Sequence, residues 1–111
     1  MQKIKVVLAD DHIVVRQGLR ALLAAEEDIE IVGEADNGRQ AVQLARQLLP
    51  DVVVMDIAMP VLNGLEATRQ ISRAVPACKV LILSSYSDDE YVQQLTEAGA
   101  AGYLVKQTAA N

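Results

Sequence analysis

Short apolar segments alternate along this chain with longer segments of helical period. Apolar runs that are continuous, rather than alternating with polar residues, are typical of parallel strands buried on both faces. The pattern predicts five strands and four helices of an α/β domain, joined by right-handed crossovers into a doubly wound parallel sheet with helices on both faces. The predicted strands span residues 4–9, 29–35, 51–55, 79–83 and 102–105.

The segments between these strands carry helix signals. A capping-box spacing at 87–90 predicts the start of the fourth helix, and Pro50 and Pro76 end the second and third. The third helix is predicted at 64–74, and a turn at 36–38 closes the second strand. The first helix is predicted to place four apolar residues on its inner face: Val15, Leu19, Leu22 and Leu23.

A fifth helix is missing from the pattern, because only residues 107–111 follow Lys106. Four helices leave one face of a five-stranded sheet undercovered, with the first helix alone beside apolar surface of the fourth and fifth strands. We therefore expect residues 1–111 to form one domain, truncated before its last helix. We also expect the bare face to drive self-association or to lower stability.

Composition narrows the functional class. The chain has 111 residues, 51% of them hydrophobic, which suits one globular domain, and its net charge of −5 provides no electrostatic footprint for nucleic acid. A single cysteine, Cys78, excludes an internal disulfide and a multi-cysteine metal site. No apolar run reaches membrane-spanning length, and residues 1–5 lack a signal-peptide core. We expect a soluble, cytoplasmic protein.

Polar groups stand where the predicted strands end. Asp10 and Asp11 follow the first strand, and Asp56 follows the third. Because parallel strands end at one edge of the sheet, we expect these carboxylates to share a cleft, where their repulsion favours a cation. Oxygen ligands alone indicate Mg²⁺ or Mn²⁺, held by two carboxylates, a backbone carbonyl and waters.

The same edge is predicted to hold Ser84 after the fourth strand and Lys106 after the fifth. A carboxylate beside a metal can accept a phosphoryl group, and a lysine and a hydroxyl can bind the oxygens of that group. We therefore interpret Asp56 as the acceptor. Each residue also has a purely structural interpretation. Asp10 and Asp11 can be a helix N-cap pair and Asp56 part of an Asx-type turn, while Ser84 can be a strand-end hydroxyl and Lys106 a solvated lysine.

Five segments carry a resemblance to a known family: residues 8–12, 55–60, 63–67, 83–84 and 99–106. On these segments the chain resembles, over essentially its whole length, the receiver domain of bacterial two-component response regulators, most closely the NarL/FixJ type. The resemblance implies a flavodoxin-like sheet of strand order 2-1-3-4-5.

The resemblance also implies a role for each matching residue. Asp56 is the expected phosphoacceptor, Asp11 a direct Mg²⁺ ligand and Asp10 a ligand mainly through water. The backbone carbonyl of Ala58 completes the metal ligands. The other implied roles are a switch hydroxyl at Ser84, a phosphate partner at Lys106 and, at Tyr103, an aromatic whose rotamer reports activation; plain packing is the alternative for Tyr103.

The chain departs from the family pattern at three positions. Gln107 replaces the proline that commonly follows the lysine, so the usual cis-proline turn is absent. Ala58 and Tyr86 occupy positions that tune the attack of water on the acyl phosphate in the family. Ala58 cannot orient a water and Tyr86 can shield the phosphoryl group, so we predict self-dephosphorylation over minutes or longer.

The implied function is a switch rather than an enzyme. A sensor histidine kinase donates the phosphoryl group, and an appended helix-turn-helix domain, absent from this sequence, reads the change as dimerisation and DNA binding. One alternative is a Mg²⁺-dependent aspartyl-phosphate phosphatase, which needs a second acid where Ala58 stands. Others are a degenerate receiver that acts as a binding module and a flavodoxin-like cofactor binder, although residues 11–14 lack a phosphate-cradling loop.

His12 is the single histidine of the chain. No cysteine or second histidine beside it indicates a zinc site, and no serine pairs with it as a nucleophile. We interpret it as a surface residue at the start of the first helix.

Overall fold

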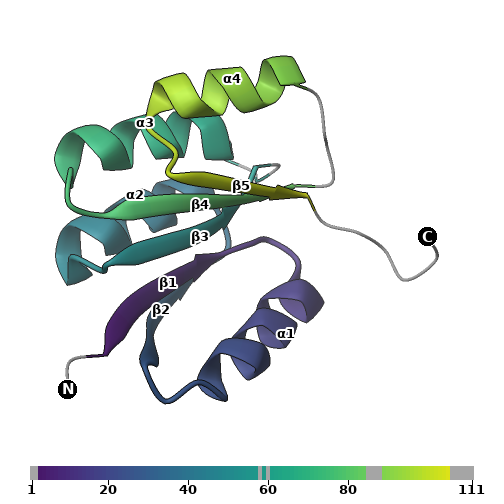
Figure 1. Cartoon of the computed structure of the whole chain (residues 1–111), viewed down its shortest axis with the longest axis vertical. Helices are drawn as coiled ribbons and strands as arrows, with labels where there is room; N and C mark the ends of the chain where they lie inside the picture. Colours follow the sequence, from purple (N-terminus) through teal and green to yellow (C-terminus); the bar gives the residue numbers. More distant parts are fainter. Residues whose placement is uncertain (1–2, 58, 60, 85–88, 106–111) are drawn as a thin grey trace.

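A computed structural model describes residues 3–57, 59, 61–84 and 89–105 of the chain. Strands and helices alternate through this part of the molecule, as Figure 1 shows. The elements are β1 (Ile4–Ala9), α1 (Ile13–Ala24), β2 (Ile29–Ala35), α2 (Gly38–Leu48), β3 (Val52–Asp56), α3 (Gly64–Ala74), β4 (Lys79–Ser84), α4 (Asp89–Ala98) and β5 (Gly102–Val105).

The five strands form one parallel sheet in the order β2-β1-β3-β4-β5. This order confirms the predicted flavodoxin-like topology. β1 lies between β2 and β3, so the ends of β1 and β3 are neighbours at one edge of the sheet. The chain runs from β1 to β2 on one side and then returns past β1 to β3, so the strand order reverses between β1 and β3. The carboxyl ends of strands at such a reversal are where open parallel sheets bind ligands.

Most boundaries match the prediction, and four do not. β3 begins at Val52 and includes Asp56, and β4 extends to Ser84, because both residues continue the ladder with neighbouring strands. Gly38 is the first residue of α2 rather than the end of a turn. The reason is the Asn37 side chain, which accepts a hydrogen bond of 2.8 Å from the backbone N–H of Gln40 and caps the helix at once.

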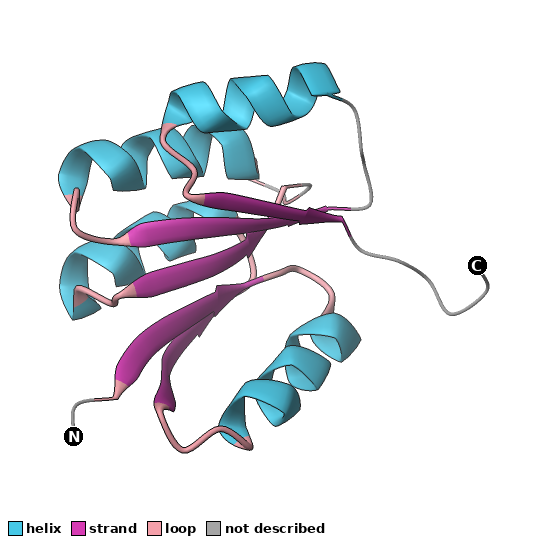
Figure 2. Ribbon diagram, in the orientation of Figure 1, coloured by secondary structure: helices cyan, strands magenta, loops and turns pink. Residues whose placement is uncertain are grey.

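Helices α2, α3 and α4 pack on one face of the sheet, here called the covered face (Figure 2). The side chains of this face form the main core, in which Ile71 of α3, Leu95 of α4 and Ile82 of β4 are at most 1% exposed. Asn63 caps α3 by accepting from the backbone N–H of Glu66 at 2.9 Å. Three helices therefore exclude water from this side of the sheet.

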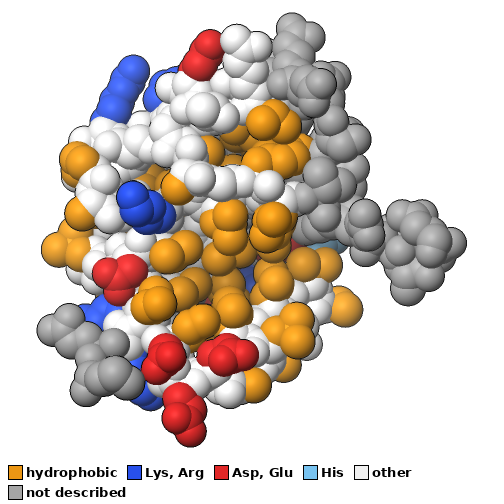
Figure 3. Space-filling model, viewed as in Figure 1, with side chains coloured by type: hydrophobic (Ala, Val, Ile, Leu, Met, Phe, Trp, Pro, Cys, Tyr) orange, Lys and Arg blue, Asp and Glu red, His pale blue; other side chains and the backbone are white. Residues whose placement is uncertain are grey.

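The opposite face, here called the open face, has α1 as its only helix among the described residues. Hydrophobic side chains gather across this face between α1 and α4 (Figure 3), and Leu104 of β5 remains 53% exposed. Within the described part of the chain, this confirms the prediction that the first helix lies alone on its face. Among the described residues, three strand residues form the buried core of the open face: Val6, Leu8 and Val54.

One expectation for α1 is wrong. Leu22 was expected on the inner face with Leu19 and Leu23, but it is 71% exposed, whereas the other two pack against the open-face core. α1 buries no residue fully, because among the described residues only the sheet lies against it and only a narrow strip of its surface touches that sheet. No helix among the described residues is long and apolar enough to cross a bilayer.

Candidate functional site

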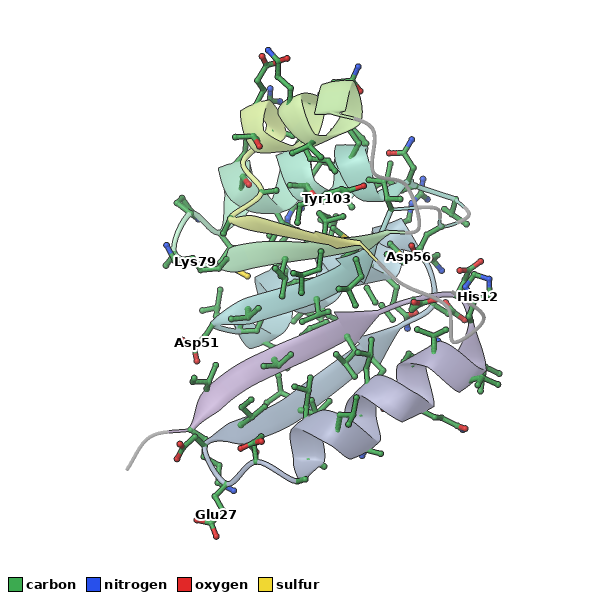
Figure 4. The ribbon with its side chains drawn as sticks, turned by 45° about the vertical axis from the view of Figure 1, so that its right-hand side comes forward. His12, Glu27, Asp51, Asp56, Lys79 and Tyr103 are labelled. Atoms are coloured by element: carbon green, nitrogen blue, oxygen red, sulfur yellow. The ribbon has the colours of Figure 1, made fainter. Side chains whose placement is uncertain are left out.

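The candidate site lies at the carboxyl edge of the sheet. Asp10 and Asp11 follow β1, and Asp56 ends β3, whose residue Met55 pairs with Ala9. Figure 4 shows His12 and Asp56 at this edge and Asp51 and Lys79 at the opposite one. The strands that are far apart in sequence therefore bring the predicted carboxylates together.

Three carboxylates and one imidazole make up the cluster. The carboxylates of Asp10 and Asp56 are buried, with 2% and 5% of each residue exposed, while the Asp11 side chain is about one-third exposed at 32%. Each residue, His12 included, offers one ligand atom, and these atoms lie within 4.8 Å of one another. This donor set is rich in hard oxygen and fits a divalent cation of the Mg²⁺ type.

His12 reaches into this cluster. It is the N-cap of α1 and its side chain is 61% exposed, as expected of a surface residue at a helix start. However, its Nδ1 atom lies 3.0 Å from Asp10 Oδ1, 3.2 Å from Asp11 Oδ1 and 3.8 Å from Asp56 Oδ2. The sequence interpretation missed this contact; the available signal was the position of His12 directly after two strand-end aspartates.

The backbone of Asp10 is held on two sides. Its N–H donates to the carbonyl of Ala35 at 3.0 Å, and its carbonyl accepts from the guanidinium of Arg16 at 2.6 Å. Arg16 also pairs with Glu34 of β2 at 3.0 Å. The N-cap interpretation of Asp10 does not fit, because Asp10 Oδ1 accepts from the backbone N–H of His12, which is itself the cap of α1.

The segment after β3 packs closely against Asp56. Ile57 is 1% exposed, and its carbonyl accepts from the N–H of Gly64 at 2.9 Å. A Cβ atom on Gly64 would lie 2.7 Å from the carbonyl oxygen of Asp56, so only glycine fits at this approach. Within this segment Val61 has φ 69°, a left-handed conformation that is rare for a β-branched residue.

The remaining predicted site residues stand as follows. Ser84 is the last residue of β4 and pairs in register with Val105 of β5. Tyr103 is half-buried and packs against the core of the covered face. Three predicted site residues lie outside the described part of the chain, so their roles stay predictions: Ala58, Tyr86 and Lys106. The same holds for the role of residues 87–88 in capping α4.

A family model described as the response regulator receiver domain matches residues 6–111. Among curated proteins, the chain is 48% identical to the transcriptional regulatory protein LiaR of Bacillus subtilis over 107 residues, which is 96% of this chain and 51% of LiaR. It is 47% identical to the response regulator GacA of Pseudomonas aeruginosa over 103 residues, 93% of this chain and 48% of GacA. The chain thus spans about half the length of these curated relatives.

Solved structures agree in fold. The signal receiver domain of the putative response regulator NarL from Mycobacterium tuberculosis has a TM-score of 0.91 and 34% identity, covering 98% of this chain and 88% of that one. A two-component response regulator of the LuxR family from Aurantimonas sp. SI85-9A1 has a TM-score of 0.90 and 35% identity, covering 97% of this chain and 77% of that one.

Proposed function

We infer the function from one premise: this chain belongs to the receiver-domain family of response regulators. We propose that it is a phosphoacceptor switch in which Asp56 receives a phosphoryl group from a sensor histidine kinase. The observation that carries the proposal is the convergence of Asp10, Asp11 and Asp56 within 4.8 Å at the carboxyl edge of the sheet. An acidic cluster that served only packing would gain nothing from such repulsion.

The proposed transfer uses the Asp56 carboxylate as nucleophile. One of its oxygens attacks the phosphorus of a phosphohistidine, the new P–O bond forms as the donor P–N bond breaks, and the leaving nitrogen keeps the bonding electron pair. The product is an acyl phosphate on Asp56 and a histidine on the kinase. The ladder between β3 and β4 and the close approach of Gly64 to the backbone carbonyl oxygen of Asp56 fix the backbone from which the Asp56 carboxylate projects.

Asp11, Asp56 and the backbone carbonyl of Ala58 are the proposed ligands of Mg²⁺ or Mn²⁺, with Asp10 acting through water. When bound, the ion neutralises the charge on the transferring phosphoryl oxygens. Asp10 is held in place for this role by the two backbone hydrogen bonds to Ala35 and Arg16. These contacts position the acid without using its side-chain oxygens.

The proposed switch couples the site to the β4–β5 side of the sheet. Ser84 donates its hydroxyl to the phosphoryl group, Lys106 pairs with the group's charge, and Tyr103 changes rotamer. Tyr103 packs against the core beneath α3 and α4, so a rotamer change there would alter the surface beside α4. We propose that this change controls transcription in the cytoplasm, through a DNA-binding domain outside this chain, since LiaR is named a transcriptional regulatory protein and is about twice as long.

The phosphorylated state of Asp56 is proposed to be long-lived. Ala58 carries no group that orients a hydrolytic water, and Tyr86 is proposed to shield the phosphoryl group. The acyl phosphate on Asp56 should therefore persist for minutes or longer. Loss of acid-labile phosphate within seconds would contradict this part of the proposal.

The test is incubation with acetyl phosphate and Mg²⁺, followed by intact-mass measurement of wild type, Asp56→Asn and Asp28→Asn. Asp28 is exposed in the loop before β2 and serves as a matched control. One added phosphate on wild type and Asp28→Asn, absent from Asp56→Asn and abolished by EDTA, is the expected result. No adduct on a folded wild-type protein would overturn the proposal in favour of a degenerate receiver that acts as a binding module.

A further inference from the structure

The imidazole of His12 lies against all three carboxylates of the proposed metal site. We propose that His12 is an additional, inner-sphere ligand of this site, which gives it a preference for transition-metal ions such as Mn²⁺, Ni²⁺ and Zn²⁺ over Mg²⁺. The inference rests on the proposed metal site and concerns which ion it selects.

The distances match those between ligands of one ion. Two atoms bound at about 2.1 Å in adjacent positions of an octahedral ion are roughly 3.0 Å apart, and in opposite positions roughly 4.2 Å. Nδ1 of His12 lies 3.2 Å from Oδ1 of Asp11, the proposed direct ligand, which is an adjacent-ligand spacing. It lies 3.0 Å from Oδ1 of Asp10, a hydrogen-bond distance that suits an acid acting through water. Its distance of 3.8 Å to Asp56 Oδ2 falls between the two cases.

Backbone contacts position the imidazole ring of His12 beside the three carboxylates. His12 is the N-cap of α1, and its N–H donates to Asp10 Oδ1 at 2.8 Å, which turns the start of the helix toward the cluster. The carbonyl of Asp10 is in turn fixed by Arg16 of α1 at 2.6 Å. Because the ring is 61% exposed, it can bind an arriving ion without disturbing packed neighbours.

A nitrogen donor changes the selectivity of a carboxylate site. Carboxylates, carbonyls and waters suit Mg²⁺, whereas imidazole suits ions later in the first transition row, whose affinity rises from Mn²⁺ to Ni²⁺. Loss of a nitrogen ligand should therefore cost little Mg²⁺ affinity and much Ni²⁺ affinity. We expect His12→Ala to weaken Ni²⁺ binding by about tenfold or more, with Mg²⁺ binding changed less than about threefold.

The decisive measurement is pulsed electron paramagnetic resonance of Mn²⁺ bound to the tag-free chain. His12 is the only histidine in the sequence, so imidazole nitrogen coupling to Mn²⁺ can come from no other residue. We expect this coupling in wild type and its absence in His12→Ala. The side chain of His12 makes no capping hydrogen bond, so the alanine variant should keep α1, which circular dichroism checks.

Calorimetric titrations with Mg²⁺, Mn²⁺ and Ni²⁺ complete the test, with Gly18→Ala on the exposed side of α1 as the control variant. Absence of nitrogen coupling in wild type, or equal weakening of all three ions in His12→Ala, would overturn the inference and leave His12 as a charge partner that the ion displaces.

Failure of this inference is distinguishable from failure of the proposed function. Phosphate added to Asp56 of the His12→Ala variant in Mg²⁺ shows that the switch chemistry stands without the imidazole. Nitrogen coupling in a wild-type protein that takes up no phosphate would leave the metal inference standing and the phosphoacceptor role refuted.

Discussion

The two faces of the sheet are built from the same strands but are stabilised differently. On the covered face, Ile82 is completely buried beneath three helices. Its neighbour on the open face, Leu81, is only half-buried, and Leu104 is 53% exposed, because α1 alone covers that side in the described residues. The helices, rather than the strand sequences, therefore decide how much each apolar residue contributes to stability.

The site lies at the edge where these two faces meet. Asp56 comes from β3, which both faces share, while His12 and Arg16 belong to α1 on the open side. The residues that hold Asp10 thus depend on the less completely packed half of the molecule. This suggests that packing of α1 and geometry of the acidic cluster are coupled.

The largest expected effect on stability comes from a comparison of two adjacent residues of β4. Ile82→Ala removes fully buried atoms and should lower the free energy of unfolding by about 3 kcal/mol. Leu81→Ala removes half-buried atoms on the open face and should cost about 1 kcal/mol. Urea denaturation of both variants measures the difference; equal losses would show that the open face is as well packed as the covered one.

A second comparison uses two glycines in helices. A Cβ on Gly38 would lie 1.8 Å from the carbonyl oxygen of Leu62, so Gly38→Ala should destabilise the protein by roughly 1–3 kcal/mol. Gly18 of α1 has no atom within 4 Å of such a Cβ, and Gly18→Ala should stabilise by about 0.5–1 kcal/mol through helix propensity. Thermal unfolding of the pair should therefore show shifts of opposite sign.

The exposed apolar side chains of the open face should promote self-association. Leu104→Lys should weaken association about tenfold, since a leucine side chain contributes about 1.5–3 kcal/mol when fully buried and Leu104 is 53% exposed. Sedimentation velocity across a concentration series measures this, with Gln94→Lys on exposed α4 surface as the control. A wild-type chain that stays monomeric throughout would contradict the expectation.

The smallest expected effect concerns Cys78 in the covered-face core. Burial raises the pKa of its thiol, the charge of Asp51 adds to this, and a backbone hydrogen bond from Val53 opposes it. The folded state therefore keeps the proton that the unfolded state loses, so stability should fall as pH rises above the ordinary thiol pKa of about 8.5. Cys78→Ala should flatten this slope, and native Cys78 should react slowly with thiol reagents until urea is added.

Much of the fold could be predicted because each strand is apolar on both faces and each connection has helical period. The stop signals at Pro50 and Pro76 predicted helix ends close to those of α2 and α3. The start of α2 could not be predicted as well, because the cap depends on the orientation of the Asn37 side chain. The exposure of Leu22 also escaped prediction, since helical spacing defines a stripe but not the width of the surface it meets.

The candidate site also has a part that could be predicted from the sequence and a part that could not. Asp10, Asp11 and Asp56 were predictable because strand ends of a parallel sheet share one edge. The contact of His12 with them was not, because it depends on how the chain turns between β1 and α1. An N-cap residue can point to solvent or back over the site, and both are compatible with the same sequence.

By itself, the sequence determined the order of strands and helices and the presence of acids at the ends of β1 and β3, because periodicity and strand ends are local properties of the chain. Only the tertiary structure decided that Leu22 lies in solvent and that the Nδ1 atom of His12 lies 3.0 Å from Asp10 Oδ1. Burial and distance depend on neighbours that folding brings from remote parts of the chain, and no local pattern records them.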